Sequence, residues 1–236
     1  MKKKGIVTGI IVTAVLLLFL SVFSVLYYTG LSGIRSYGRS TVGIRVACVG
    51  DSITYGYGVK NWPERNYPAV LQDLLGPEYI VNNYGVSGYA VQKDSNKPYV
   101  SRKEYRSSLE FDPDIVIFML GSNDSKPANW KGKEKFRKDY ISLIESYRDS
   151  LIILCTPPKA FPADETETSF HIQPGVVDEI AETVRETAAE LRLPLLDINA
   201  ITSAHPEWYV SDSVHLNADG AAALARQIEK ELRALL

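Results

Sequence analysis

A serine with the potential to act as a nucleophile follows an apolar run. Ser52 lies in the run GDSIT at residues 50–54, directly after the β-branched stretch Arg45–Val49. A serine at the carboxyl end of a buried strand lies where α/β sheets bind ligands, and its own N–H can face a developing oxyanion. The alternative is that Ser52 only caps the next helix. Because the run is not G-x-S-x-G, it gives no support to the α/β-hydrolase fold.

A carboxylate and an imidazole near the C-terminus are suited to activating such a serine. Asp212 and His215 are three residues apart in the run DSVH. At this spacing in a turn, the carboxylate can fix the tautomer of the imidazole while the other ring nitrogen reaches a hydroxyl. Taken alone, such a histidine is more often a surface or capping residue. Together with Ser52, the pair predicts nucleophilic catalysis at an acyl group.

Two further runs provide candidate donors to an oxyanion. Gly85 lies in NYGVSG at residues 83–88, and Asn123 lies in GSND at residues 121–124. Without a Cβ, Gly85 either leaves its N–H open to a substrate oxygen or serves an ordinary turn with positive φ. The side-chain amide of Asn123 either donates to the same oxygen or caps a turn.

An alternation of strand and helix patterns positions these runs. Short apolar runs bounded by turn residues indicate buried strands, and longer runs with apolar residues at helical spacing indicate helices. This alternation predicts a parallel sheet with helices on both faces, so that residues following the strands meet at one rim. The expected strands are Arg45–Val49, Tyr79–Asn82, Ile115–Leu120, Leu151–Cys155 and Pro194–Ile198, and the expected helices are Tyr67–Leu75, Phe136–Tyr147, Val176–Leu191 and Ala218–Leu235.

The order of these blocks resembles the SGNH (GDSL-like) hydrolase superfamily over residues 44–235. The resemblance implies a flavodoxin-like three-layer α/β/α sandwich with a five-stranded parallel sheet. It also implies hydrolysis of esters through an acyl-enzyme, with no cofactor. Carried over block by block, it implies Ser52 as nucleophile, Asp212 and His215 as its triad partners, and Ser52, Gly85 and Asn123 as oxyanion donors.

The run GSNDSKPANW at residues 121–130 resembles bacterial carbohydrate esterases and sialate O-acetylesterase-like members of that superfamily. This resemblance implies short-chain, above all acetyl, esters of carbohydrates as substrates. Asp51, Lys126 and Trp130 are the candidate substrate-binding residues. Trp130 either stacks on a sugar ring or packs against the domain, and Lys126 either bonds sugar hydroxyls or is solvated. A lysophospholipase or thioesterase, an O-acetyltransferase and a non-catalytic glycan-binding module are the alternatives.

The first 30 residues differ from the rest of the chain. Lys2–Lys4 precede an uncharged stretch over residues 5–30. As a helix with a rise of about 1.5 Å per residue, this stretch is long enough to cross a hydrocarbon core of about 30 Å. We expect residues 1–30 to form an uncleaved signal anchor, with a cleaved signal peptide or a buried core helix as alternatives. The lysines favour a catalytic domain outside the cytoplasm, held at the cell membrane or secreted if the segment is cleaved.

Composition restricts the other functions of the chain. With 26 Lys and Arg against 28 Asp and Glu, the net charge of -2 gives no basic footprint for nucleic acid. Three histidines and two cysteines, without HExxH or paired CxxC, offer no ligands at the usual zinc spacing, so we expect no metal. Cys48 and Cys155 lie in apolar strand-like runs and are expected to be buried free thiols.

The 236 residues suffice for one catalytic domain. We expect this domain at residues 44–236, after a linker at residues 31–43 that mixes Gly, Ser and Arg without apolar periodicity. The long loop at residues 156–175 is expected to be either a solvated connection or a lid that faces the substrate. The tyrosine-rich segment at residues 55–67 either borders the pocket or covers the edge of the sheet.

Overall fold

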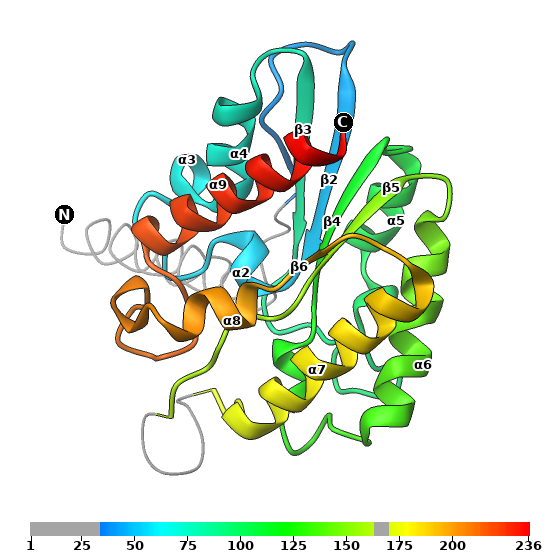
Figure 1. Ribbon diagram of the computed structural model, residues 1–236, viewed down its shortest axis with the longest axis vertical. Coiled ribbons are helices and arrows are strands. Elements are labelled where there is room, and N and C mark those ends of the chain that lie inside the picture. The colour runs from blue at the N-terminus through cyan, green and yellow to red at the C-terminus, as the bar shows by residue number, and fades with distance from the viewer. Residues whose placement is uncertain (1–33, 163–169) are drawn as a thin grey trace, which may run out of the picture. The chain divides into compact units, whose positions relative to one another are not determined.

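A central sheet with helices on both faces organises the residues that the computed structural model describes, which are 34–162 and 170–236 (Figure 1). Within these residues the sheet has six strands in the order β1-β3-β2-β4-β5-β6. The pairs from β3 through β6 are parallel, whereas β1 runs antiparallel to β3. The strands are β1 (Arg35–Ser36), β2 (Ile44–Gly50), β3 (Tyr79–Gly85), β4 (Ile115–Met119), β5 (Leu151–Cys155) and β6 (Leu195–Leu196).

The predicted α/β class and its five parallel strands are confirmed, but the sheet is mixed. Counted alone, the parallel strands follow the order 2-1-3-4-5 of flavodoxin-like folds. The additional, antiparallel strand is β1, which lies at one edge of the sheet and within the segment 31–43 that we expected to be a linker. Arg35 pairs with Asn83, and the Tyr37 N–H donates to the Val81 carbonyl oxygen at 2.9 Å. The linker prediction is wrong for these residues, because backbone pairing along the open edge of β3 requires no apolar periodicity.

Helices α4 and α9 cover one face of the sheet, and α5, α6 and α7 cover the other (Figure 1). Of the predicted helices, α4 and α9 have the expected bounds, whereas α6 begins and ends three residues earlier than expected. The helices are α2 (Ser52–Tyr55), α3 (Trp62–Arg65), α4 (Tyr67–Leu75), α5 (Lys103–Glu110), α6 (Lys133–Ile144), α7 (Pro174–Leu191), α8 (Ile198–Ser203) and α9 (Ala218–Leu235), with short 3-10 turns at Tyr99–Ser101, Ser122–Ser125, Glu145–Tyr147 and Pro206–Trp208.

Strand β2 lies between two hydrophobic cores. Because side chains alternate along a strand, Val46 and Cys48 enter the core under α4 and α9, while Ala47 and Val49 enter the core under α6 and α7. All four side chains are fully buried, which explains why β2 is a nearly continuous apolar run. The carboxyl end of β2 at Gly50 is therefore fixed between the ends of β3 and β4.

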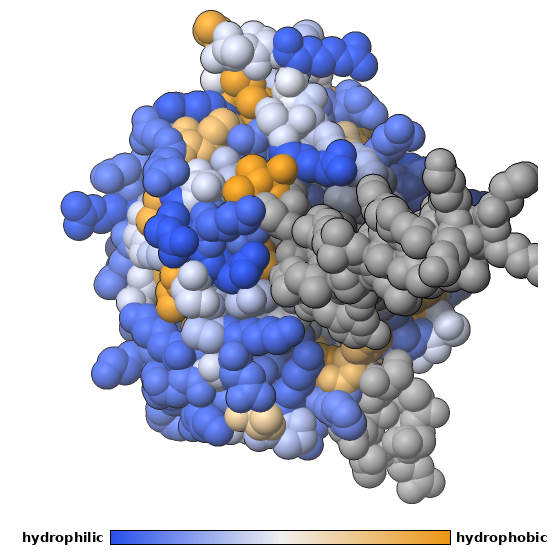
Figure 2. All heavy atoms as spheres, turned by 180° about the vertical axis from the view of Figure 1, so that it is seen from behind, coloured by the Kyte–Doolittle hydropathy of each residue, from blue (hydrophilic) through white to orange (hydrophobic). Residues whose placement is uncertain are grey.

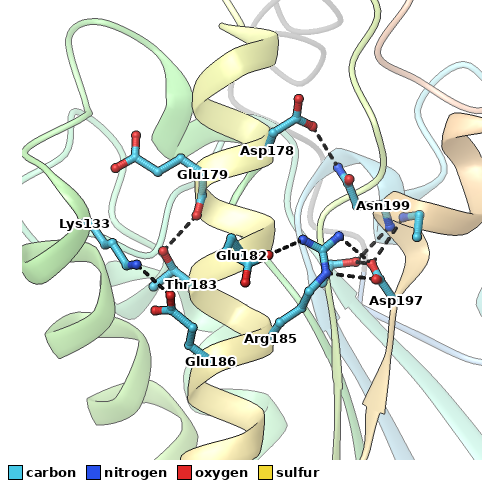
Figure 3. Close-up of polar contacts among 11 residues, drawn as sticks. Lys133, Asp178, Glu179, Glu182, Thr183, Arg185, Glu186, Asp197 and Asn199 are labelled. Atoms are coloured by element: carbon cyan, nitrogen blue, oxygen red, sulfur yellow. Dashed lines mark hydrogen bonds and ion pairs between the residues drawn. The ribbon is translucent and has the colours of Figure 1, made fainter.

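Polar contacts join α7 to its neighbours (Figure 3). Lys133 of α6 donates to Glu186 at 2.8 Å, and Arg185 donates to both carboxylate oxygens of Asp197 at 2.8 and 3.0 Å. Asp197 also accepts the N–H of Ala200 and caps α8. The exposed Lys133–Glu186 pair contributes only about 0–1 kcal/mol. Together these contacts connect α7 to α6 on one side and to the start of α8 on the other (Figure 3).

On the face in Figure 2, hydrophilic residues cover most of the described surface, with small hydrophobic areas between them. No helix within residues 34–162 and 170–236 is long and apolar enough to cross a membrane. The anchor predicted at residues 1–30 lies outside the described residues. Cys48 and Cys155 are buried free thiols, as predicted.

Candidate active site

Ser52 is the first residue of α2, directly beyond the carboxyl end of β2. The residue before it, Asp51, is the N-cap, and its Oδ1 accepts the backbone N–H of Ile53 at 3.0 Å. The alternative that Ser52 itself caps the helix is therefore wrong. The Ser52 side chain is left to interact outside its own helix.

Two glycines allow this turn to pack against the ends of β2 and β3. A Cβ on Gly50 would lie 1.9 Å from Thr54 Oγ1, and a Cβ on Gly85 would lie 2.2 Å from the backbone nitrogen of Tyr55. Atoms cannot approach this closely, so any larger side chain at either position would displace the turn. The chain path through Ser52 thus depends on the absence of two side chains in neighbouring strands.

Ser52, His215 and Asp212 form one hydrogen-bonded chain. His215 Nε2 lies 2.9 Å from Ser52 Oγ, and His215 Nδ1 lies 2.8 Å from Asp212 Oδ2. Asp212 Oδ1 accepts the backbone N–H groups of Val214 and His215. Burial acts to raise the pKa of Asp212, but these bonds from the His215 ring and the two N–H groups outweigh it and lower the pKa. An ionised Asp212 favours the Nδ1–H tautomer, which leaves Nε2 able to accept a proton from Ser52.

The hydrogen-bonded chain opens onto a pocket of about 150 Å³. One wall is aromatic, because the rings of Tyr57 and Phe170 lie 4.4 and 5.0 Å from the His215 ring, centroid to centroid. Phe170 and Ile172 belong to the C-terminal end of the loop at residues 156–175. This end of the loop lines the pocket and so is more than a solvated connection. The lining residues are Ser52, Tyr57, Ser87, Gly88, Ser122, Asn123, Lys126, Phe170, Ile172, Val214 and His215.

Of the two predicted oxyanion donors outside Ser52, the structure brings Asn123 to the pocket but not Gly85. Gly85 is the last residue of β3 and is absent from the pocket lining, and its N–H is donated to Asn83 Oδ1 at 2.8 Å. The prediction for Gly85 is wrong, because β3 extends three residues further than expected and reaches the rim later. Gly88 lies at that rim, lines the pocket and has a φ of 85° that favours glycine.

The three candidate substrate-binding residues have different positions. Lys126 lines the pocket. Asp51 does not, because it is 1% exposed and its Oδ2 accepts from the Asn123 amide at 3.4 Å. Trp130 is also outside the lining, and it packs on the core with its ring 6.1 Å from that of Phe136. The substrate-binding predictions for Asp51 and Trp130 are therefore wrong for the described pocket, and packing against the domain is the correct alternative for Trp130.

Two buried residues hold the rim together, a role that the sequence did not indicate for either of them; Asn129 was instead a candidate for hydrogen bonds to sugar hydroxyls. Asn129 donates to the Asn123 carbonyl oxygen at 2.8 Å. The carboxylate of Asp124 accepts the backbone N–H groups of Val91 and Gln92 at 2.9 and 2.8 Å, which ties the loop after β4 to the loop after β3. In the sequence, both residues are marked only by lying in the run GSNDSKPANW, which also contains Asn123.

Burial gives Asp124 an unusual ionisation. The pKa of Asp124 is raised from the ordinary 3.8 to about 7. Burial is the main cause and the charge of Asp51 adds to it, whereas the two backbone hydrogen bonds act to lower the pKa. The folded protein therefore binds a proton at Asp124 between about pH 4 and pH 7 that the unfolded chain releases. The stability that this proton provides is complete below about pH 4 and is lost as the pH rises through 7.

We predict that Asp124→Asn removes this pH dependence. The free energy of unfolding of the unsubstituted protein should fall, relative to that of the variant, by up to about 1.4 kcal/mol per pH unit between pH 4 and 7. Urea unfolding at a series of pH values measures the difference. Asp149→Asn, at a fully exposed position, is the control and should retain the original dependence. Parallel pH profiles for the Asp124 variant and the unsubstituted protein would contradict the prediction.

Comparison of the sequence with known proteins identifies a family and a relative. The GDSL-like lipase/acylhydrolase family matches residues 48–223. An acetylxylan esterase of Xylanibacter ruminicola is 34% identical over 212 residues, which cover 80% of this chain and 43% of that protein. The chain thus spans less than half the length of this curated relative.

Solved structures with the same fold include esterases. The M. smegmatis aryl esterase is 19% identical, with a TM-score of 0.69 over 82% of this chain and 100% of its own. A carbohydrate acetylesterase from Sinorhizobium meliloti is 18% identical, with a TM-score of 0.67 and the same two coverages. At these identities the two likenesses establish the fold alone.

Proposed function

Since the chain belongs to the GDSL-like lipase/acylhydrolase family, we propose that it is a serine esterase that removes acetyl groups from carbohydrates. Membership of this family makes it a carboxylic ester hydrolase. The observation that carries the proposed mechanism is the hydrogen-bonded chain Ser52–His215–Asp212 at the mouth of a small pocket.

In the proposed mechanism, Ser52 Oγ attacks the carbonyl carbon of the ester while His215 Nε2 takes the hydroxyl proton. Asp212 holds the His215 ring through Nδ1 and stabilises the imidazolium that forms. His215 then donates its proton to the departing sugar oxygen as the carbon–oxygen bond breaks. Water, activated by the same His215 nitrogen, attacks the acetyl-enzyme and releases acetate.

The negative oxygen of the tetrahedral intermediate requires donors that are already in place. We propose that the backbone N–H groups of Ser52 and Gly88 and the side-chain amide of Asn123 provide them. The position of Asn123 is supported from both sides, because Asp51 accepts from its amide and Asn129 donates to its carbonyl oxygen. Such support reduces the reorganisation that the donors need during the reaction.

The size of the pocket favours an acetyl group. The pocket beside Ser52 has a volume of about 150 Å³, which leaves space for a small acyl group. Phe170, Ile172 and Val214 give it apolar lining, which suits a methyl group better than a charged one. Carbohydrate as the alcohol part of the ester is supported by the 34% identity to an acetylxylan esterase and by the run at residues 121–130.

We predict that hydrolysis is confined to short acyl groups and depends on Ser52. The whole chain should release acetate from p-nitrophenyl acetate and from acetylated xylo-oligosaccharides, with kcat/KM at least about tenfold lower for an octanoyl ester. Ser52→Ala should lower the rate by at least about 10³-fold, whereas the exposed control Ser203→Ala should not change it. A preference for octanoyl would indicate a lipid esterase, and acetyl transfer to sugar exceeding hydrolysis would indicate a transferase. Either result would contradict the proposal.

A second prediction concerns the oxyanion donors. Asn123→Ala removes a donor that acts mainly on the intermediate, so kcat should fall by about 10²- to 10³-fold while KM changes far less. Steady-state kinetics with p-nitrophenyl acetate measures both constants. Asn96→Ala, at an exposed position, is the matched control. An unchanged kcat in the Asn123 variant would remove this residue from the mechanism.

Residues 1–30 support a proposal about location. We propose that the uncharged stretch 5–30 anchors the chain in the cell membrane with its catalytic domain on the extracytoplasmic side, where glycans too large to enter the cell are found. Protease added to intact cells should then digest the catalytic domain. A domain that stays protected until the membrane is broken would contradict this proposal.

A further inference from the structure

A lysine, Lys126, lines the pocket of a chain that is slightly acidic as a whole. The net charge of the chain is -2, yet the ionisable lining residues in the described part are Tyr57, Lys126 and His215, with no Asp or Glu. Lys126 comes from the turn after Ser122–Ser125 and so lies on the side of the pocket formed by Asn123. A substrate bound for attack by Ser52 therefore lies beside an ammonium group.

The ammonium group of Lys126 has no direct partner among the described residues. It makes no hydrogen bond or ion pair there, in contrast to Lys131, Lys133 and Lys135, which all make such contacts. The nearest acid by its electrostatic effect is Asp51, whose carboxylate is already bonded to Ile53 and Asn123. Burial lowers the pKa of Lys126, the charge of Asp51 raises it, and the charge of Lys97 lowers it. Asp51 therefore offsets the charge of Lys126 only from a distance, and an anion bound directly beside this half-buried ammonium would stabilise it further.

Lys97 adds a second cation to the same rim. Its Cδ and Nζ both lie 3.9 Å from the point where a Cβ on Gly88 would stand, so its side chain lies beside Gly88, one of the proposed oxyanion donors. The ammonium lies 5.9 Å from the centre of the Tyr89 ring. Unlike Lys126, the Lys97 side chain is exposed, so solvent and salt screen its charge more strongly.

We propose that Lys126 and Lys97 bind an anionic group, a carboxylate or a phosphate, on the sugar that carries the acetyl ester. The preferred substrates are then acetylated acidic sugars rather than neutral ones. The inference rests on the proposed function, because the anion is placed relative to the acetyl group that Ser52 attacks. Lys126 is the principal specificity-determining residue, since it lines the pocket and is shielded from solvent on part of its surface.

Simple hydrogen bonding to sugar hydroxyls explains the lysines less well. Hydroxyl groups would accept from an ammonium but would leave its charge uncompensated, whereas an anion both accepts and neutralises. The ammonium is a charged donor in both cases, but an anionic acceptor adds a coulombic attraction that a neutral hydroxyl lacks, and this attraction is stronger where solvent is partly excluded. An anion also restricts which sugar position meets Ser52, because the distance between the charge and the ester is fixed by the sugar.

Matched pairs of acetylated sugars test this proposal. The first pair is an acetylated methyl glucuronoside and its uronamide, which differ in charge but hardly in shape. The second pair is an acetylated glucose 6-phosphate and the acetylated glucose. The readout is the ratio of kcat/KM for the charged member to that for the neutral member, measured by acetate release with the whole chain.

The charged member should be hydrolysed at least about tenfold more efficiently in one or both pairs at about 50 mM salt, and this ratio should decrease at about 500 mM salt. Preference in the first pair alone identifies a carboxylate, and preference in the second pair alone identifies a phosphate. Lys126→Gln should reduce the ratio to near one, and Lys97→Gln should reduce it less. Lys230→Gln, an exposed position on α9, is the control and should retain both the ratio and the activity.

The outcomes separate this inference from the proposed function. Equal hydrolysis of charged and neutral sugars, or a ratio that the double variant of Lys126 and Lys97 leaves unchanged, overturns the inference while the esterase proposal stands. If no acetyl ester is hydrolysed in a Ser52-dependent manner, the proposed function fails and this inference fails with it.

Discussion

The 2.9 Å contact between Ser52 Oγ and His215 Nε2 joins residues that are 163 positions apart in the chain. It forms because β2 is fixed between β3 and β4 and ends at one rim of the sheet, where α2 begins. His215 arrives at the same rim just before α9, which packs along α4 on the core that β2 also enters. Sheet topology and helix packing together therefore determine the geometry of the proposed nucleophile.

Buried polar groups adjust this rim at the scale of single hydrogen bonds. Asp51 caps α2 and accepts from Asn123, while Asn129 holds the Asn123 carbonyl oxygen and Asp124 ties two loops together. A half-satisfied buried group would be costly, so each of these residues tolerates little change. Among the described residues, Lys126 in the pocket that they support has no such hydrogen-bonded partner, and this contrast is the basis for proposing an anionic substrate.

Sequence reasoning located the features that depend on local chemistry. Asp212 and His215 lie within one short turn, and the alternation of apolar runs is enough to predict five parallel strands. Sequence reasoning failed for residues whose positions depend on tertiary contacts. The strand end that separates Gly85 from Gly88 is set by pairing with β2, and the inward packing of Trp130 is set by the core around Phe136. Strand β1 has only two residues, and helix α5 is a short and mostly polar segment, so neither is recognised before the elements that they pack on are known.

The central claim is that His215 makes Ser52 nucleophilic. Covalent labelling of the whole chain with a serine-directed fluorophosphonate, followed by peptide mass spectrometry, tests it without reference to any particular ester. The account predicts a single labelled peptide that contains Ser52, with a labelling rate at least about 10²-fold lower in His215→Ala. Labelling of another serine, or equally fast labelling of Ser52 without the imidazole, would contradict it.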